Sequence, residues 1–191
     1  SYPEAQGVNK AKEGYETIAE GNSKCIKTDI YTTYIPIPAG NLRDALEEAS
    51  NKVIVSLPQG TLYHKIAPDS YHISVLPIQD KPFDKEHAEL TSDELRAIEQ
   101  AISGVASRFK PFGLKFLGLR FGKDGGVIAV FDDEGNNLVT LRNEIFNECN
   151  KACNGKVSTA RTKPFVHVTL LRIFSPLSQE ALGLLKARAR E

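Results

Sequence analysis

One short pattern occurs twice in this sequence, as Tyr71-His72-Ile73-Ser74-Val75 and as Val166-His167-Val168-Thr169-Leu170. Each copy has a histidine, an aliphatic residue, a hydroxyl residue and a second aliphatic residue in succession. This alternation of polar and apolar residues is typical of a half-buried strand. Because alternate side chains of a strand share a face, each copy should present an imidazole and a hydroxyl on one face and aliphatic side chains on the other.

One copy alone carries little weight, since a lone histidine in a strand is usually a hydrogen-bonded structural residue rather than a catalyst. Two copies, each in a predicted strand and each within a similar order of strands and helices, are much harder to attribute to chance. If the two halves pack around a pseudo-twofold axis, the two strands lie side by side and His72 and His167 face one cleft. We therefore expect both motifs to contribute to one site.

The rest of the chain supplies strands and helices in a repeated order. Strands are predicted over 30–37, 70–78, 114–121, 127–131 and 165–174, and helices over 42–50, 92–109, 138–153 and 177–190. Asn41 is the expected N-cap of the first helix, and Thr91 to Glu94 form a capping-box start for the second. An apolar run, Val53-Ile54-Val55-Ser56-Leu57, follows the first helix. This order predicts an α+β fold with two similar halves over residues 30–191, preceded by a polar N-terminal arm over residues 1–29.

Composition narrows the class of protein further. The chain has 191 residues and 41% hydrophobic residues, which suits one globular domain. Its longest apolar runs are too short to cross a membrane. With 24 basic and 24 acidic residues it has no net charge with which to hold long duplex nucleic acid.

Three cysteines, an odd number in a chain of this length, do not indicate a disulfide framework and favour a reducing compartment, the cytoplasm. Cys149 and Cys153 are four residues apart in a predicted helix, where they either pack in the core or form half of a metal site. The sequence has no HExxH, CxxC, P-loop, GxGxxG or GxSxG motif. No metal site and no cofactor is therefore expected.

The two motifs resemble those of the two-histidine phosphoesterase superfamily, which includes 2′,3′-cyclic phosphodiesterases and RNA 2′–5′ ligase-like proteins. Members carry two copies of His-Φ-(Ser/Thr)-Φ, with Φ an aliphatic residue, on the central strands of two pseudo-symmetric lobes. Here the copies are His72 to Val75 and His167 to Leu170, 95 positions apart, and the similar layout extends from about Ile30 to Phe174. The stretch Lys65 to Ser70 is also similar to an uncharacterised branch of the superfamily. The resemblance implies two lobes of antiparallel sheet with flanking helices around a central cleft.

The resemblance also implies a function. His72 and His167 would be the catalytic residues, and Ser74 and Thr169 would bind the phosphate of a nucleotide or RNA end. Imidazoles titrate near neutral pH, so two of them can serve as general base and general acid without a metal. The implied activity is a metal-independent phosphodiesterase acting on a 2′,3′-cyclic phosphate, a 2′–5′ linkage or a small cyclic nucleotide. The alternative is a non-catalytic module of the same fold that binds a nucleotide or RNA end.

One aromatic residue near the second motif stays ambiguous from sequence. Phe165 lies two residues before His167 on the same predicted strand face, where it either stacks on a base at the cleft or fills the core. Other basic residues nearby, and the other two histidines, are given no site role: Arg161, Lys163, Arg172, His64 and His87.

Overall fold

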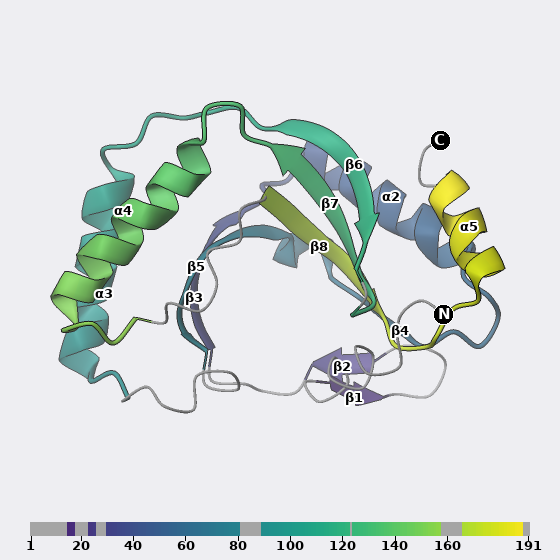
Figure 1. The fold of residues 1–191 in the computed structure, drawn as a ribbon, viewed down its shortest axis with the longest axis horizontal. Coiled ribbons are helices and arrows are strands. Elements are labelled where there is room, and N and C mark those ends of the chain that lie inside the picture. The colour runs from purple at the N-terminus through teal and green to yellow at the C-terminus, as the bar shows by residue number, and fades with distance from the viewer. Residues whose placement is uncertain are drawn as a thin grey trace.

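The computed structural model describes residues 15–17, 23–25, 30–80, 89–122, 124–157 and 166–188. Within these ranges the chain forms an α+β fold, as predicted, in which helices pack against one six-stranded sheet (Figure 1). Most of the predicted arm, and the residues Phe165, Arg161, Lys163 and His87, lie outside the described residues. The arm contributes two short strands, β1 (Tyr15–Thr17) and β2 (Ser23–Cys25), which pair with each other.

The main sheet is antiparallel in all of its described pairings. Its strands lie in the order β3-β5-β8-β7-β6, and β4 pairs with the C-terminal end of β8. Their bounds are β3 Ile30–Pro36, β4 Tyr63–Lys65, β5 His72–Asp80, β6 Lys115–Phe121, β7 Gly126–Asp132 and β8 Val166–Ile173. The two strands that carry the motifs, β5 and β8, are direct neighbours, which confirms that prediction.

In the described part of the chain, four helices flank this sheet: α2 (Asn41–Val55), α3 (Ser92–Ala106), α4 (Asn137–Ala152) and α5 (Gln179–Arg188). In Figure 1, α3 and α4 lie together at the β5 side of the molecule, and α2 and α5 lie together at the other side. A one-turn 3₁₀ helix, η2 (Pro68–Ser70), leads into β5. No helix in the described ranges is long and apolar enough to cross a membrane.

Two expectations about α2 were wrong. The helix does not end near Ser50 but continues to Val55, so the apolar run after it forms its last turn. The reason is tertiary: Val53 packs into a second core between α2, α5 and the ends of β7 and β8, and this burial outweighs the weak helix preference of β-branched residues. The N-cap is Gly40 rather than Asn41, and no side chain caps this end.

The helix start at Thr91 is confirmed. Thr91 Oγ1 accepts a hydrogen bond from the Glu94 amide at 3.2 Å, and Glu94 Oε2 accepts one from the Thr91 amide at 2.8 Å. The apolar face of α4 packs in the core, where Leu138, Leu141, Ile145 and Cys149 are buried. Cys149 and Cys153 are free and fully buried, which favours core packing over half of a metal site.

Candidate functional site

The register of β5 against β8 brings the two motifs together. Ile73 lies opposite Val168, so one further step in either direction sets His72 opposite Thr169 and Ser74 opposite His167. Residues opposite each other in an antiparallel pair point to the same face, with Cα atoms roughly 4.5–5.5 Å apart. The two histidines are then diagonal neighbours, roughly 7–8 Å apart. Both imidazoles and both hydroxyls therefore share one face of the sheet.

The opposite face of the two strands is the core. Ile73 and Val75 of β5, and Val168 and Leu170 of β8, are all buried in one cluster with residues of α3 and α4. This burial fixes which face each strand turns outward, because a slip of one residue would put the polar side chains into the core. His72, Ser74 and Thr169 are partly exposed, and His167 is 9% exposed.

Both motif strands carry a bulge at the equivalent position. In the β3–β5 pairing, Tyr34 lies opposite Ser74 and Thr33 opposite Leu76, so Val75 is skipped. In the β7–β8 pairing, Ile128 lies opposite Thr169 and Val127 opposite Leu171, so Leu170 is skipped. Each bulge thus comes one residue after the motif hydroxyl.

The bulges explain why two consecutive apolar residues follow each hydroxyl. A bulge brings successive side chains toward the same face, which lets Val75 and Leu76 in β5 and Leu170 and Leu171 in β8 all be buried. Because both strands have this bulge, they are alike in geometry as well as in sequence. A rotation about an axis between Ile73 and Val168 exchanges His72 with His167 and Ser74 with Thr169.

His72 is oriented by the turn before it. Its Nδ1 lies 2.9 Å from the carbonyl oxygen of Ser70, the last residue of η2. A carbonyl only accepts, so Nδ1 carries the hydrogen of this bond and Nε2 is left for other partners. The backbone thereby sets both the ring orientation and the nitrogen that chemistry can use.

Tyr34 is an aromatic residue of this site that the sequence did not single out. It lies in β3 opposite Ser74, on the face of the motif residues, and its side chain is 56% exposed. Its ring centroid is 5.1 Å from that of His72, and the two ring planes are tilted by 56°. Its place in a predicted strand was visible in the sequence, but the partner strand and register that bring it to His72 were not.

Arg142, on α4, is a buried cation behind the site. It is 3% exposed, and its guanidinium donates from Nε to the Val75 carbonyl at 2.9 Å and from Nη2 to the Ser74 carbonyl at 2.7 Å. Burial lowers the pKa of Arg142 from its ordinary value, partly opposed by the charge of Asp133. Arg142 has no signal of this role in the sequence, because it follows Leu141 in an amphipathic helix, where a cation is normally solvent-facing.

In β8 a different group serves the equivalent carbonyl. Leu170, the skipped residue of the second bulge, accepts a hydrogen bond from the Ile66 amide at 3.0 Å, just after β4. The backbone beside β4 thus supports the bulge of β8, whereas the Arg142 side chain supports that of β5. The two motif strands are alike, but their supports are not.

Of the residues given no site role, Arg172 is held in an ion pair. Its Nη1 lies 2.7 Å from Asp124 Oδ2 in the β6–β7 hairpin. Burial would raise the pKa of Asp124, but the hydrogen bond and charge of Arg172 outweigh it, so the pKa stays below its ordinary value. His64 lies in β4 opposite Arg172. Neither residue belongs to the motif cluster, which consists of His72, Ser74, His167 and Thr169.

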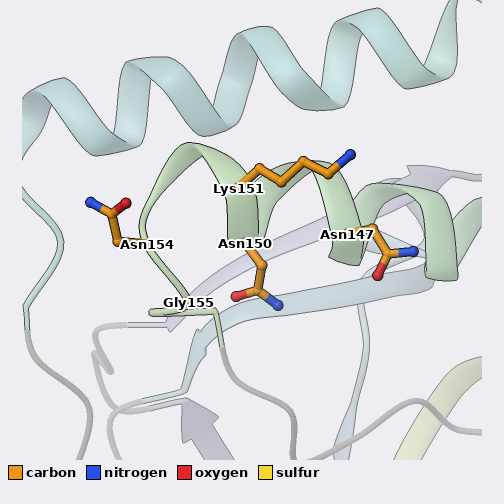
Figure 2. A pocket seen from close by; sticks show the side chains of 5 residues that line it. All are labelled: Asn147, Asn150, Lys151, Asn154 and Gly155. Atoms are coloured by element: carbon orange, nitrogen blue, oxygen red, sulfur yellow. The ribbon is translucent and has the colours of Figure 1, made fainter.

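Three cavities lined by described residues lie away from the motif face. One, of about 520 Å³, is at the end of α4, where Figure 2 shows Asn147, Asn150, Lys151, Asn154 and Gly155 around it. Two of its polar side chains serve the local structure: Lys151 pairs with Glu148 at 2.6 Å, and Asn150 accepts from the Val157 amide at 3.2 Å. The other two, of about 210 and 700 Å³, lie beside β6. Among the described residues, no group of three or more His, Cys, Asp or Glu side chains could hold a metal ion.

Comparison with known proteins supports the fold alone. No family model matches the sequence, and neither does the sequence of any curated protein. The structure is similar to the crystal structure of TT0787 of Thermus thermophilus, with a TM-score of 0.58 and 19% sequence identity. The match covers 76% of this chain and 75% of that chain. At this identity the similarity indicates a shared α+β architecture and carries no statement about activity.

Proposed function

We propose that this protein is a metal-independent phosphodiesterase that cleaves a cyclic or 2′–5′ phosphodiester of a nucleotide or RNA end. In this proposal the fold is of the two-histidine phosphoesterase kind, with two pseudo-symmetric lobes around a central cleft. The observation that carries it is the β5–β8 register, which sets an imidazole opposite a hydroxyl twice on one sheet face. The equivalent bulges in β5 and β8 support the internal symmetry.

The proposed chemistry needs two proton transfers. One imidazole accepts a proton from the water that attacks phosphorus, and the other, protonated, donates its proton to the ribose oxygen that leaves. The two rings exchange protonation states in one turnover, and exchange with solvent restores them. His72 would act through Nε2, because Nδ1 donates to the Ser70 carbonyl.

Ser74 and Thr169 would hold the phosphate during this reaction. Each hydroxyl lies opposite one histidine, so a phosphate over the middle of the four side chains is within reach of both. A hydroxyl donates a hydrogen bond without bringing a charge of its own, and such a donor stabilises the charge that develops on the non-bridging oxygens. Neutral overall charge fits a compact substrate or an RNA end better than long duplex nucleic acid.

We further propose the cytoplasm as the location, because Cys149 and Cys153 are free and a reducing compartment keeps thiols so. Fractionation of cells that express a tagged full-length protein tests this. Recovery of the tag in an extracytoplasmic fraction would contradict it.

The activity is tested by incubating the protein with 2′,3′-cyclic nucleotides, 2′–5′ oligoadenylate and cyclic dinucleotides, with and without EDTA. We expect turnover of at least one class, unchanged by chelation. The matched control is His64→Ala, which removes a strand histidine outside the motif cluster and should leave turnover unchanged. Binding without turnover would favour the non-catalytic module, and loss of turnover in EDTA that a divalent ion restores would favour a metal enzyme.

A further inference from the structure

The motif residues leave the direction of the substrate open. The rotation that exchanges β5 with β8 exchanges His72 with His167 and Ser74 with Thr169. A substrate therefore meets the same kinds of polar side chain whether its nucleoside lies over β5 or over β8. A preference for one direction needs residues beside the motifs. Among the described residues, the strands that flank the motif pair are β3, next to β5, and β7, next to β8.

The two flanks differ at the equivalent positions that lie opposite the two motif hydroxyls. Tyr34 of β3 lies opposite Ser74, and Ile128 of β7 lies opposite Thr169. Because both pairings lie on the site side of equivalent bulges, these two residues correspond under the same rotation. One flank therefore presents an exposed aromatic ring, and the other presents a half-buried aliphatic side chain.

Tyr34 also has the position that contact with a substrate requires. Its ring lies 5.1 Å from the His72 ring, and its side chain is 56% exposed. With strands about 4.8 Å apart, Tyr34 is roughly 7 Å from the line midway between β5 and β8. A phosphate bound on that line is separated from Tyr34 by about the width of a ribose.

We propose that Tyr34 stacks on the nucleobase of the substrate and so fixes its direction, with the nucleoside over β3 and β5. This inference rests on the proposed function, and it narrows the substrate to one that carries a base beside the scissile phosphate. Stacking tolerates any base, because every base has a π face. Ile128 would then lie on the side of the phosphate that faces away from the nucleoside.

The test pairs two substrates with two variants. The substrates are adenosine 2′,3′-cyclic phosphate and methyl riboside 2,3-cyclic phosphate, which lacks the base, or a 2′–5′ adenylyl dinucleotide and its abasic counterpart if that class is cleaved. Alanine substitution of a stacking ring costs about 5- to 150-fold in binding. We expect Tyr34→Ala to raise KM by this factor for the substrate with a base, and to leave KM for the abasic substrate within about twofold. Tyr34→Phe should keep the wild-type KM for both, and Ile128→Ala should change KM similarly for both.

Several outcomes would overturn the proposal. An equal rise for both substrates would mean that Tyr34 acts only through His72, and no rise for either would mean that Tyr34 does not contact the substrate. A larger base-dependent effect in Ile128→Ala would reverse the direction. The same comparison of Kd, with adenosine 2′-phosphate and ribose 2-phosphate, tests Tyr34 even where turnover is absent. Failure of the proposed function shows differently: as absence of turnover for every substrate, or as turnover that survives loss of His72 or His167, whatever Tyr34 does.

Discussion

Ser74 lies opposite His167 in the β5–β8 pair, and Thr169 lies opposite His72. Each therefore places a hydroxyl beside an imidazole. Neither can take over a proton transfer, because a hydroxyl is too weak an acid and base near neutral pH. Their contribution is limited to one hydrogen bond each to the phosphate. At the scale of single residues, the hydroxyls and the imidazoles should therefore differ in what their loss costs.

We expect Ser74→Ala and Thr169→Ala each to lower kcat by about 10²–10³-fold at most, the effect of removing one transition-state donor. Steady-state kinetics on the preferred substrate measures this. Ser70→Ala is a suitable control, because Ser70 is exposed and contacts His72 through its backbone carbonyl rather than its side chain. A loss for either motif hydroxyl well beyond that range would mean that it does more than hold the phosphate.

The cysteines of α4 make a separate prediction. Burial, reinforced by Cys153 and Glu148, raises the pKa of Cys149 to about 11, so its thiol stays protonated at neutral and mildly alkaline pH. Since the thiolate is the nucleophile, we expect Cys149 not to react with Ellman's reagent in the folded protein at about pH 8. Cys153 should not react either, because it is fully buried and out of reach of the reagent. A Cys25→Ser background leaves these two thiols as the only reporters. Rapid reaction of either without denaturant would show that it is accessible.

The shared sheet face of the four motif residues could be predicted from sequence, because a repeated pattern marks them locally. The places of Tyr34 and Arg142 could not, because they depend on contacts with residues about 40 and 68 positions away. A strand register or a helix–strand contact of that range has no local signature in one sequence. The bulges did have a signal, the paired apolar residues Val75-Leu76 and Leu170-Leu171, which break the alternation at the same step.

At the scale of elements, the bulge of β5 is held by side chains from two other elements, β3 and α4. The Thr33 hydroxyl of β3 donates a hydrogen bond to the Leu76 carbonyl at 3.1 Å and accepts one from the Leu76 amide at 3.0 Å. The Arg142 guanidinium of α4 donates hydrogen bonds to the Ser74 and Val75 carbonyls. Since Ser74 lies within this arrangement, α4 should influence the site without contacting the substrate.

We expect Arg142→Met to lower both stability and kcat. Each buried carbonyl that loses its donor costs about 1–3 kcal/mol, and Ser74 loses a constraint on its direction. Urea unfolding gives the first quantity, and kcat well below the melting temperature gives the second. Arg108→Met is the control, because its exposed pair with Glu144, at 3.5 Å, should contribute less than about 1 kcal/mol. A folded Arg142→Met protein with wild-type kcat would exclude a positioning role.

The start of α4 makes a prediction about pH. Its N-cap, Asn136, is in the left-handed region at φ 52° and makes no side-chain cap. Asp133 takes that role, accepting from the Leu138 amide at 2.6 Å and from Asn137 Nδ2 at 3.1 Å. Burial would raise the pKa of Asp133, but these hydrogen bonds outweigh it and leave the pKa below its ordinary value.

We expect Asp133→Ala to cost about 1 kcal/mol of unfolding free energy at neutral pH, the usual value of a helix cap. Because the folded pKa is lowered, this difference should be constant above the unfolded pKa of about 4 and should shrink as the pH falls through the folded value. Urea unfolding at a series of pH values measures it, with Glu134→Ala as a control for charge. A difference that grows toward acid pH would contradict this account.

Element boundaries followed local signals where those signals were strong. The capping box at Thr91 and the glycine after α4, Gly155 at φ 81°, mark helix ends that were predicted correctly. The end of α2 was not predicted, because Val53-Ile54-Val55 favours a strand locally while the second core holds it in a helix. The place of β4 at the C-terminal end of β8 was also not predicted, since a three-residue strand has almost no pattern of its own.

For the whole molecule, the strand order puts the motif strands in the middle of the sheet and the helices against its core face (Figure 1). Repetition along the chain predicted the α+β class and the β5–β8 contact, because similar halves tend to pack symmetrically. The walls of a cleft could not be derived in this way. The segments next to the motif strands, residues 81–88 and 158–165, lie outside the described residues, and Phe165 is among them.

The central claim is that His72 and His167 act together on one phosphodiester. The most direct measurement is kcat for His72→Ala, His167→Ala and the double variant on the substrate that the wild type cleaves best, with circular dichroism to check folding. Each single substitution should lower kcat by about 10²–10⁴-fold, and the double variant should be little worse than the poorer single one, because the two transfers belong to one reaction. Near-full turnover in either folded single variant would mean that its histidine is structural and that the paired mechanism is wrong.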